Sequence, residues 1–474
     1  MNKILRNRLF IVIFGFVVFS VALNFVLQRF IARDNFLESS RAIFSEVTHM
    51  LHTNDDVIAT VKRNFKENCR LRARIAAALI ENDRSIIESH DRLIELAELL
   101  KVDDTNWNTN YTYVFVHGLS GWGQYDSIYK LMPYWGMFGG DLMEYLGDKG
   151  FNVAAASVAP TNSAWDRACE LYAQLTGTKT DYGKAHSERC NHERYGEDFT
   201  GRALIDAFSE EDKINLLGHS FGGATIRLFA SIMEKGSAEE IAATPKGELS
   251  DYFKGGKGDW IYSVTALAAP SNGTSTYNVG EHEEEPEEAP EKEPEKSNPI
   301  KDKLSSVMNE LMSTFTGGEK DGRIESDYAS YDMYIDNALE LNKTIITYKD
   351  TYYFAIPCSA TEKQADGTYA PIESKMESLF VSSSAAMGAY TGVTKGGYVI
   401  DETWLENDGL VNTVSAMAPS SAPWTNYTQG SVNPGIWNVM PVYEGDHMSL
   451  QGGMTKMNDV KTLYVEHLSM INSL

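Results

Sequence analysis

A serine between two glycines joins an apolar strand to a helix, and this corner is the feature that most constrains the fold. Residues 213–228 read KINLLGHSFGGATIRL, in which INLL is typical of a buried strand and the segment after the glycines is typical of a helix. The pentapeptide Gly218–Gly222 matches the pattern G-x-S-x-G. Glycine suits a corner where strand and helix backbones approach so closely that a Cβ atom would clash, and the serine at its apex is strained. The stretch therefore predicts an α/β fold with Ser220 as a nucleophile.

Short apolar runs, Gly-rich turns and helical stretches alternate from about residue 105 to the C-terminus, a texture typical of an α/β domain. The clearest predicted strands are 111–118, 213–220, 260–270 and 344–357. A chain of 474 residues has room for one large domain with appendages or for two domains. We therefore predict one domain over residues 105–474, built on a central and mostly parallel sheet.

The composition excludes one class of partner and limits covalent cross-linking. The formal net charge is -24 at pH 7, and the sequence has no cluster of Lys and Arg of the kind that binds phosphate backbones. Nucleic acid is therefore excluded as a partner. The four cysteines are too few and too widely spaced for a disulfide framework, although Cys169 and Cys190 could pair in an oxidising compartment.

The first 33 residues have the features of a membrane anchor. An apolar run extends from Leu9 to Leu27 behind three basic residues, and its length is close to the roughly 20 residues that span a bilayer. Because the run is longer than the apolar core of a signal peptide, residues 1–33 are predicted to be a signal anchor, with the rest of the chain outside the cytoplasm. The small residues that end at Ala22 leave cleavage and secretion as the alternative.

Three segments are predicted to be appendages of the α/β core. Residues 34–104 carry apolar residues at helical spacing and predict a helical stalk, although a membrane helix followed by such a segment also resembles the extracytoplasmic sensor start of bacterial membrane signalling proteins. Residues 280–299 are rich in Glu and Pro, which predicts a disordered acidic loop. The apolar stripe of residues 300–318 predicts either a core helix or a mobile lid.

Ser220 needs a histidine and a carboxylate as partners, because a serine hydroxyl is a weak nucleophile until a histidine accepts its proton and an acid orients that histidine. At such a corner the acid and then the histidine are expected to follow the serine in the sequence. The histidines after Ser220 are His282, His447 and His467. The first lies in the acidic loop and the last in a terminal helical segment, so His447 is the predicted base. The predicted acid is Asp408, at an Asp-Gly turn, with Asp446 as the alternative.

Two backbone amides are predicted to stabilise the negative charge that develops when such a serine attacks a carbonyl. Phe221 begins the predicted helix, where unpaired N–H groups and the helix dipole favour an anion. The second donor is expected in the loop after the strand YVFVHG, which gives Leu119 this role. His117, in the same loop, is predicted to be structural.

Five stretches resemble the bacterial true lipases of the Geobacillus and Staphylococcus thermoalkalophilic group, which are α/β-hydrolases. They are VFVHGLSGWG, NSAWDRACELYAQLTGTKTDYGKAHSERCNHERYG, LLGHSFGGATIRL, WLENDGLVNTVS and GDHMSL, in this order over about residues 110–474. The resemblance implies an α/β-hydrolase fold with a helical lid, and a nucleophile, acid and base at Ser220, Asp408 and His447. It also implies hydrolysis of acylglycerol esters.

The resemblance further implies a structural zinc ion, held by an insertion at about 121–200. Its ligands fall on Asp166, His186, His192 and Asp332, a set that can close a tetrahedral shell. Cys190 is close enough in sequence to compete for the metal. Family members also bind calcium near the base, but Ser449 and Met454 stand where carboxylates would be expected, which puts calcium in doubt. No organic cofactor is implied.

Together these observations predict a serine carboxylic-ester hydrolase, and most specifically a triacylglycerol lipase that acts on a lipid ester through an acyl-enzyme. Two alternatives remain from the sequence. One is an esterase of short, soluble esters without activation at lipid interfaces. The other is a membrane-anchored binding or sensory protein that keeps the hydrolase fold without using it. The sequence does not predict the oligomeric state.

Overall fold

A computed structural model describes residues 107–279, 323–453 and 457–474. They belong to one compact unit, Trp107–Leu474. The predicted anchor, stalk, acidic loop and lid, at residues 1–33, 34–104, 280–299 and 300–318, lie outside the described residues. Within the part of the chain that is described, no helix combines the length and the apolar character needed to cross a membrane.

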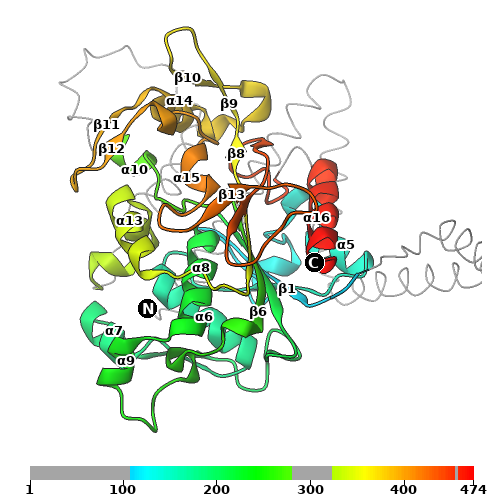
Figure 1. Cartoon of the computed structure of the whole chain (residues 1–474), viewed down its shortest axis with the longest axis vertical. Helices are drawn as coiled ribbons and strands as arrows, with labels where there is room; N and C mark the ends of the chain where they lie inside the picture. Colours follow the sequence, from blue (N-terminus) through cyan, green and yellow to red (C-terminus); the bar gives the residue numbers. More distant parts are fainter. Residues whose placement is uncertain (1–106, 280–322, 454–456) are drawn as a thin grey trace, which may run out of the picture. The chain divides into compact units, whose positions relative to one another are not determined.

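A seven-stranded sheet has the order β13-β14-β7-β6-β5-β1-β2. Figure 1 shows this sheet at the centre of the unit, with β1, β6 and β13 labelled. The strands are β1 (Thr112–Val116), β2 (Val153–Ala156), β5 (Ile214–His219), β6 (Ile261–Leu267), β7 (Tyr352–Ile356), β13 (Trp424–Asn426) and β14 (Trp437–Val439). Every pair of neighbouring strands in this sheet is parallel. The predicted parallel sheet is confirmed, and its buried strands are apolar on both faces because helices cover both.

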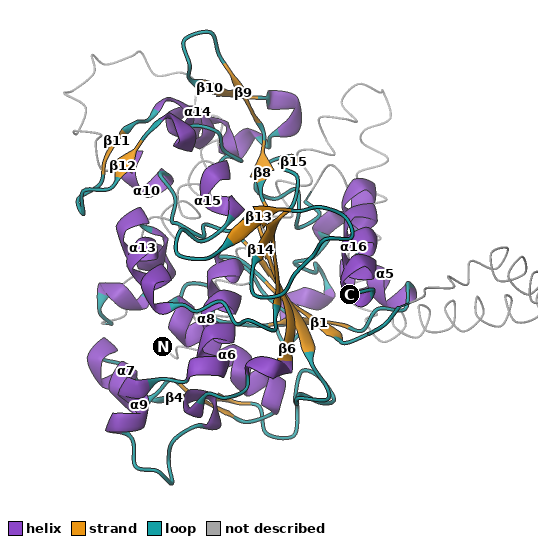
Figure 2. Ribbon diagram, in the orientation of Figure 1, coloured by secondary structure: helices purple, strands orange, loops and turns teal. Residues whose placement is uncertain are grey.

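Strand β1 illustrates how alternate residues serve the two faces. Val114 and Val116 belong to the hydrophobic core shared with α6 (Ala164–Thr176) and α8 (Phe221–Lys235). Phe115 points to the other face, where its ring lies 5.7 Å from that of Tyr464 in α16 (Met457–Asn472). Figure 2 shows α6 and α8 on one side of the sheet and α16 with α5 (Leu142–Asp148) on the other. The side-chain period of two thus fixes the three-layer architecture.

The remaining elements are short and lie around this core. The helices are α7 (Lys184–Cys190), α9 (Ala238–Ala243), α10 (Thr276–Val279), α12 (Ala329–Met333), α13 (Ile335–Thr344), α14 (Val381–Ala389) and α15 (Thr413–Met417). Four two-stranded sheets pair β3 (Lys179–Asp181) with β4 (Tyr195–Asp198), β8 (Cys358–Ser359) with β15 (Tyr443–Glu444), β9 (Thr361–Lys363) with β10 (Tyr369–Pro371), and β11 (Gly392–Val393) with β12 (Val399–Ile400). The 3-10 helices are η2 (Ser127–Lys130), η3 (Met137–Gly139), η4 (Asp251–Lys254), η5 (Gly258–Trp260), η7 (Glu325–Asp327), η8 (Glu373–Lys375), η9 (Ser378–Phe380) and η10 (Glu402–Trp404).

Two sequence predictions need correction against these boundaries. The predicted strand 344–357 is a strand only over β7, because Thr344 ends α13 and a turn precedes Tyr352. The range 121–200 is not one insertion, since β2 within it belongs to the central sheet. The chain passes from β1 to β2 on one side and then returns to β5 on the other side of β1. Sites of open α/β sheets lie at the carboxyl ends of the strands at such a reversal, and both β1 and β5 end there.

Candidate active site

The corner after β5 has the strained geometry that the sequence predicts. Ser220 lies between the end of β5 and the start of α8 with φ 56° and ψ −129°. A Cβ atom on Gly218 would lie 2.4 Å from the carbonyl carbon of Gly222. A Cβ atom on Gly222 would lie 2.3 Å from the carbonyl oxygen of Val116 in β1. Both distances are far below a van der Waals contact, so the two glycines are required by the close approach of β5, α8 and β1.

The structure brings Ser220, His447 and Asp408 into one hydrogen-bonded series. Nε2 of His447 lies 2.7 Å from Oγ of Ser220, and Nδ1 of His447 lies 2.8 Å from Oδ2 of Asp408. The exposed fractions of the three residues are 4%, 2% and 0%. An ionised carboxylate only accepts, so Nδ1 carries the proton and Nε2 accepts from the serine hydroxyl. That is the arrangement in which a histidine acts as a general base.

Asp408 is fixed in place by the Asp-Gly turn that it begins. Its Oδ1 accepts hydrogen bonds from the amides of Leu410, at 3.0 Å, and Val411, at 2.8 Å. Gly409 has φ +101°, a conformation that glycine adopts without cost. The turn therefore directs one oxygen to the backbone and the other to the imidazole.

Asp446, the alternative acid, faces away from the imidazole. Its carboxylate accepts from the amide of Glu377 at 2.8 Å, from the amide of Met448 at 3.2 Å and from the hydroxyl of Ser449 at 2.8 Å. Burial raises the pKa of Asp446. Ser449, which replaces an expected calcium ligand, thus bonds directly to Asp446 and helps to close the loop that carries the base. The geometry favours Asp408 as the acid.

The two amides predicted to hold an oxyanion lie beside the nucleophile. Phe221 is the first residue of α8, so its N–H is one of the amides that a helix leaves unpaired. Among the described residues the Leu119 amide makes no hydrogen bond, whereas the amide of the next residue, Ser120, donates to the carbonyl of Pro160 at 2.9 Å. The Leu119 and Phe221 amides are thus available for a ligand.

Arg167 supports this loop, and sequence reasoning missed it. Its guanidinium is fully buried in α6 and donates to the carbonyl oxygens of His117 and, at 3.3 Å, Gly118. The guanidinium carbon also lies 5.1 Å from the centre of the Phe221 ring. Burial lowers the pKa of Arg167 to about 10, so the side chain remains charged near neutral pH. Nothing in the stretch NSAWDRACEL distinguishes this arginine from an exposed one, because its acceptors are backbone carbonyls.

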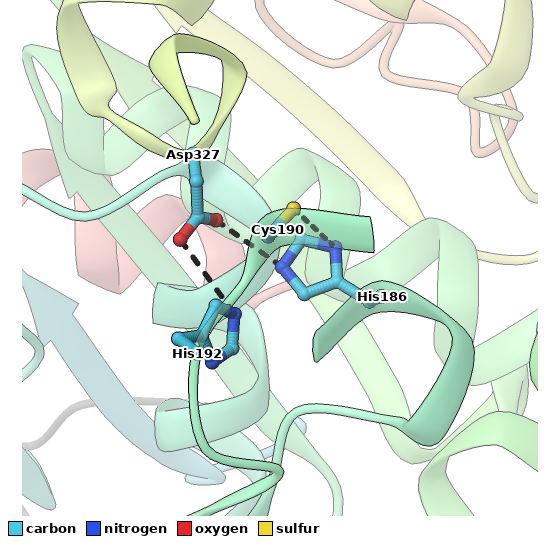
Figure 3. A group of neighbouring side chains, drawn as sticks. All are labelled: His186, Cys190, His192 and Asp327. Atoms are coloured by element: carbon cyan, nitrogen blue, oxygen red, sulfur yellow. Dashed lines mark hydrogen bonds and ion pairs between the residues drawn. The ribbon is translucent and has the colours of Figure 1, made fainter. Parts of the chain in front are cut away.

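A second group of polar side chains, drawn in Figure 3, consists of His186 and Cys190 from α7, His192 from the turn after it and Asp327 from η7. Asp166 of α6 lies beside the two histidines. His186 Nε2 lies 3.1 Å from Oδ1 of Asp166 and 3.2 Å from Oδ1 of Asp327. His192 Nε2 lies 3.7 Å from Oδ1 of Asp166 and 3.6 Å from Oδ2 of Asp327. Three of the four predicted metal ligands, Asp166, His186 and His192, are thus brought together, and the fourth residue of this cluster is Asp327.

Asp332, the predicted fourth ligand, has a different partner. Its Oδ2 accepts from the amide of Ala164 at 2.7 Å, at the N-terminus of α6. Burial raises the pKa of Asp332 to about 7. Asp327 and Asp332 lie in separate short helices, η7 and α12, and only Asp327 contacts both histidines. The ligand assignment is therefore corrected from Asp332 to Asp327.

Cys190 belongs to the edge of this cluster. Its sulfur lies 3.8 Å from Nδ1 of His186, which is the ring nitrogen that faces away from the carboxylates. Cys169 and Cys190 are not bonded to each other, and among the described cysteines no disulfide is formed, so the pairing left open by the sequence is absent. Cys190 therefore packs against a histidine of the cluster without standing between the histidines and the acids.

The donor set fits a divalent cation. Nδ1 of His192 lies 2.9 Å from the carbonyl oxygen of Glu193, which only accepts, so Nδ1 carries the proton and Nε2 presents a lone pair. That Nε2 is buried, and no residue of the described part of the chain forms a hydrogen bond with it. Burial acts to lower the pKa of His186, but Asp166 and Asp327 outweigh it and raise that pKa to about 11. A guanidinium nitrogen of Arg323 also lies 3.6 Å from Oδ2 of Asp166 and 3.2 Å from Oδ2 of Asp327, so part of the negative charge is already paired. The lone pair of His192 and the two carboxylates are nevertheless ligand types that a divalent metal ion accepts.

Comparison with known proteins identifies the family. The family model described as "Lipase-like, C-terminal domain" matches residues 109–285 and 320–467. Lipase 1 of Staphylococcus aureus is 29% identical over 379 residues, covering 76% of this chain and 54% of that protein. The chain thus spans about half the length of the curated relatives it matches.

Solved structures agree with the family match. The structure of EstA from Clostridium botulinum is 30% identical, covers 79% of this chain and 90% of that chain, and superposes with a TM-score of 0.65. The Staphylococcus hyicus lipase is 26% identical, covers 78% of this chain and 98% of that chain, and has a TM-score of 0.61. The resemblance to staphylococcal lipases is confirmed, and the chain belongs to this lipase-like family.

Proposed function

We propose that this protein is a serine carboxylic-ester hydrolase, and specifically a lipase of acylglycerols. The observation that carries the proposal is the hydrogen-bonded series Ser220–His447–Asp408 beside the available amides of Leu119 and Phe221. A binding module has no need of a nucleophile, a base and an acid in this geometry. Membership of a lipase-like family supports the same reaction class.

The reaction follows from the direction of the hydrogen bonds. Oγ of Ser220 attacks the ester carbonyl carbon while its proton passes to Nε2 of His447. The carbonyl oxygen becomes an oxyanion and accepts hydrogen bonds from the Leu119 and Phe221 amides. When the tetrahedral intermediate collapses, the alcohol leaves with the proton from His447, and the acyl group stays on Ser220. Water then repeats the same steps, with His447 taking its proton, and releases the carboxylic acid.

The substrate class is tested with esters of different chain length. The purified full-length protein is assayed on tributyrin and on triolein, below and above the concentration at which each ester forms a separate phase. A lipase is expected to hydrolyse both and to accelerate when the lipid phase appears. Rates confined to the soluble butyrate ester, with no such acceleration, would identify a short-chain esterase. No hydrolysis of either ester would support the non-catalytic alternative.

We also propose that the protein is exported and held at the membrane by residues 1–33, with cleavage near Ala22 as the alternative. The apolar run behind basic residues supports this placement. Intact cells that produce the full chain are treated with an added protease. The catalytic domain is expected to be digested in the treated cells and, in untreated cells, to sediment with the membrane fraction. A protected domain would contradict export, and recovery in the medium would indicate cleavage.

For the second cluster we propose a structural zinc ion held by Asp166, His186, His192 and Asp327. When bound, zinc would supply a four-ligand cross-link between α6, the segment around α7 and the chain before α12. Two histidines and two carboxylates leave no open position, so the site would stabilise the fold and take no part in ester hydrolysis. The lone pair of His192 Nε2 and its two carboxylate neighbours support this choice.

Asp327→Asn is expected to weaken zinc binding more than about 100-fold, because losing a ligand costs more than losing an outer-shell partner, which itself costs about 10- to 100-fold. Zinc content after dialysis and the unfolding temperature report the loss. The matched control is Asp332→Asn, which can still accept from the Ala164 amide and is expected to retain zinc. If Asp327→Asn keeps its zinc and Asp332→Asn loses it, the corrected assignment is refuted.

A further inference from the structure

His219, the residue before the nucleophile, has a side chain that the reaction described above does not use. The residue ends β5 and is 1% exposed. The centre of its ring lies 6.0 Å from that of Tyr134 and 5.0 Å from that of His447. The G-x-S-x-G pattern leaves this position open, so the pattern alone assigns the side chain no role.

Hydrogen-bond chemistry fixes the protons around this ring. Nε2 of His219 lies 2.8 Å from the carbonyl oxygen of His447, and a carbonyl only accepts, so Nε2 carries a proton. Burial, with a smaller effect from His447, lowers the pKa of His219 to about 3, so the ring is neutral and Nδ1 presents a lone pair. The hydroxyl of Tyr134, 2.7 Å from Nδ1, therefore donates to it. The same hydroxyl oxygen accepts from the amide of Gly118 at 3.0 Å.

The result is a series in which each group donates to the next: the Gly118 amide to Tyr134, the Tyr134 hydroxyl to His219, and the His219 ring to the His447 carbonyl. It joins two loops that are far apart in sequence. One follows β1 and carries the oxyanion donor Leu119, and the other carries the base.

Both ends of the series are next to reacting groups. A Cβ atom on Gly118 would lie 2.8 Å from the Cβ atom of Ser220, so the Gly118 backbone packs directly on the nucleophile. The peptide that follows Gly118 contains the Leu119 amide. At the other end, the amide of His447 donates to the carbonyl of Asp408 at 2.9 Å, so with His219 both backbone groups of the base are held. Displacing either end would change the distance between the base, the nucleophile and the oxyanion donors.

We propose that His219 and Tyr134 are positioning residues that hold the oxyanion loop and the base loop at a fixed separation through this series of hydrogen bonds. The inference rests on the proposed ester hydrolysis, because that reaction requires the two loops to act on one carbonyl group. A neutral His219 also adds no positive charge beside His447 when that base becomes an imidazolium. The separation of the two loops matters because a small displacement of a reacting group lowers the turnover rate and leaves substrate binding largely unchanged.

Two substitutions at residue 219 distinguish the effect of the hydrogen bond to the His447 carbonyl from the effect of side-chain packing. In His219→Gln the side-chain amide reaches the position of Nε2 and can donate to the His447 carbonyl. In His219→Asn the amide reaches only the position of Nδ1, so the bond to His447 is lost. We expect kcat to fall by about 10- to 100-fold in His219→Asn with KM unchanged, as for the loss of one buried hydrogen bond, and His219→Gln to recover most of that loss. Equal losses in the two variants would overturn the proposal.

Tyr134→Phe tests the other half of the series and keeps the shape of the side chain. It is expected to lower kcat and to weaken binding of a boronic acid, which forms a tetrahedral adduct with the serine, while KM stays unchanged. The matched control is Tyr113→Phe, which removes a buried hydroxyl bonded to the Leu468 carbonyl on the α16 face. If Tyr134→Phe binds the boronic acid as tightly as Tyr113→Phe, the inference fails.

The rate of labelling by a fluorophosphonate probe separates this inference from the proposed function. A native protein that neither hydrolyses esters nor takes up the probe refutes the function itself. Native protein that is labelled, together with His219→Asn and Tyr134→Phe variants labelled at the native rate, refutes only the positioning roles. Unfolding temperatures measured on each variant identify any that fail to fold, in which case the isosteric Tyr134→Phe carries the decision.

Discussion

Replacing Ser220 by alanine is expected to abolish ester hydrolysis, with turnover lower by about a million-fold, as for removal of other activated serine nucleophiles. The reason is that the hydroxyl is the atom that bonds to the acyl group, and His447 and Asp408 have no reacting group to act on without it. The residual rate would come from the oxyanion donors and substrate binding alone. Two measurements check the result: hydrolysis of tributyrin, and the mass added by a fluorophosphonate probe.

A matched control keeps this prediction specific. Ser449 lies in the base loop, and its hydroxyl donates to Asp446 rather than to the imidazole. Ser449→Ala is expected to take up the fluorophosphonate on Ser220 and to lose activity far less than Ser220→Ala. If Ser220→Ala still gains the mass of the probe and hydrolyses tributyrin at the native rate, another side chain is the nucleophile and the assignment of Ser220 is wrong.

The hydrogen-bonded series of Ser220, His447 and Asp408 could be proposed from the sequence, because the serine and the acid each lie at a turn with its own local signal. The glycines around Ser220 and the Asp-Gly turn at Asp408 are dictated by backbone geometry, which local sequence controls. His447 was identified as the base by eliminating the other two histidines that follow Ser220. Strands β1, β5 and β6 could be predicted as readily. A parallel sheet that is covered on both faces requires continuous apolar runs, and these three strands have them.

The fourth residue of the candidate metal site could not be predicted in the same way. Asp327 and Asp332 stand five residues apart in one short stretch, and each is a plausible carboxylate ligand by composition. Which of them meets the histidines depends on the break between η7 and α12 and on the position of α6, whose first amide is bonded by Asp332. Both depend on the tertiary structure and cannot be deduced from the spacing of residues in the sequence.

Arg167, Tyr134 and His219 were missed for a related reason. Apart from the bond between Tyr134 and His219, their partners are backbone groups of His117, Gly118 and His447, and a backbone amide or carbonyl cannot be recognised from the sequence. The strand predicted at 344–357 was wrong over its first residues for a different reason. Its first residues are β-branched and apolar, which favours a strand, but Thr344 ends α13 and Ile346 is 38% exposed. Packing overrode local propensity there.

Asp408→Asn is expected to lower turnover by about 10,000-fold while leaving the fold intact. The asparagine oxygen can still accept from the amides of Leu410 and Val411, so the turn is preserved. Its NH₂ group, however, would face Nδ1 of His447 and donate to it, which forces the imidazole proton onto Nε2. A protonated Nε2 cannot accept the Ser220 proton. The measurement is kcat on tributyrin, with the unfolding temperature as the check on folding.

The comparison that decides this prediction is Asp446→Asn. Asp446 is adjacent to His447 in sequence, but its carboxylate bonds to the Glu377 and Met448 amides and the Ser449 hydroxyl, not to the ring. Its replacement can loosen the base loop without changing the imidazole tautomer, so the loss of kcat is expected to be much smaller than in Asp408→Asn. The opposite ranking, with Asp446→Asn the more damaged enzyme, would transfer the acid role to Asp446 and show that the hydrogen bond between Asp408 and His447 does not control the base.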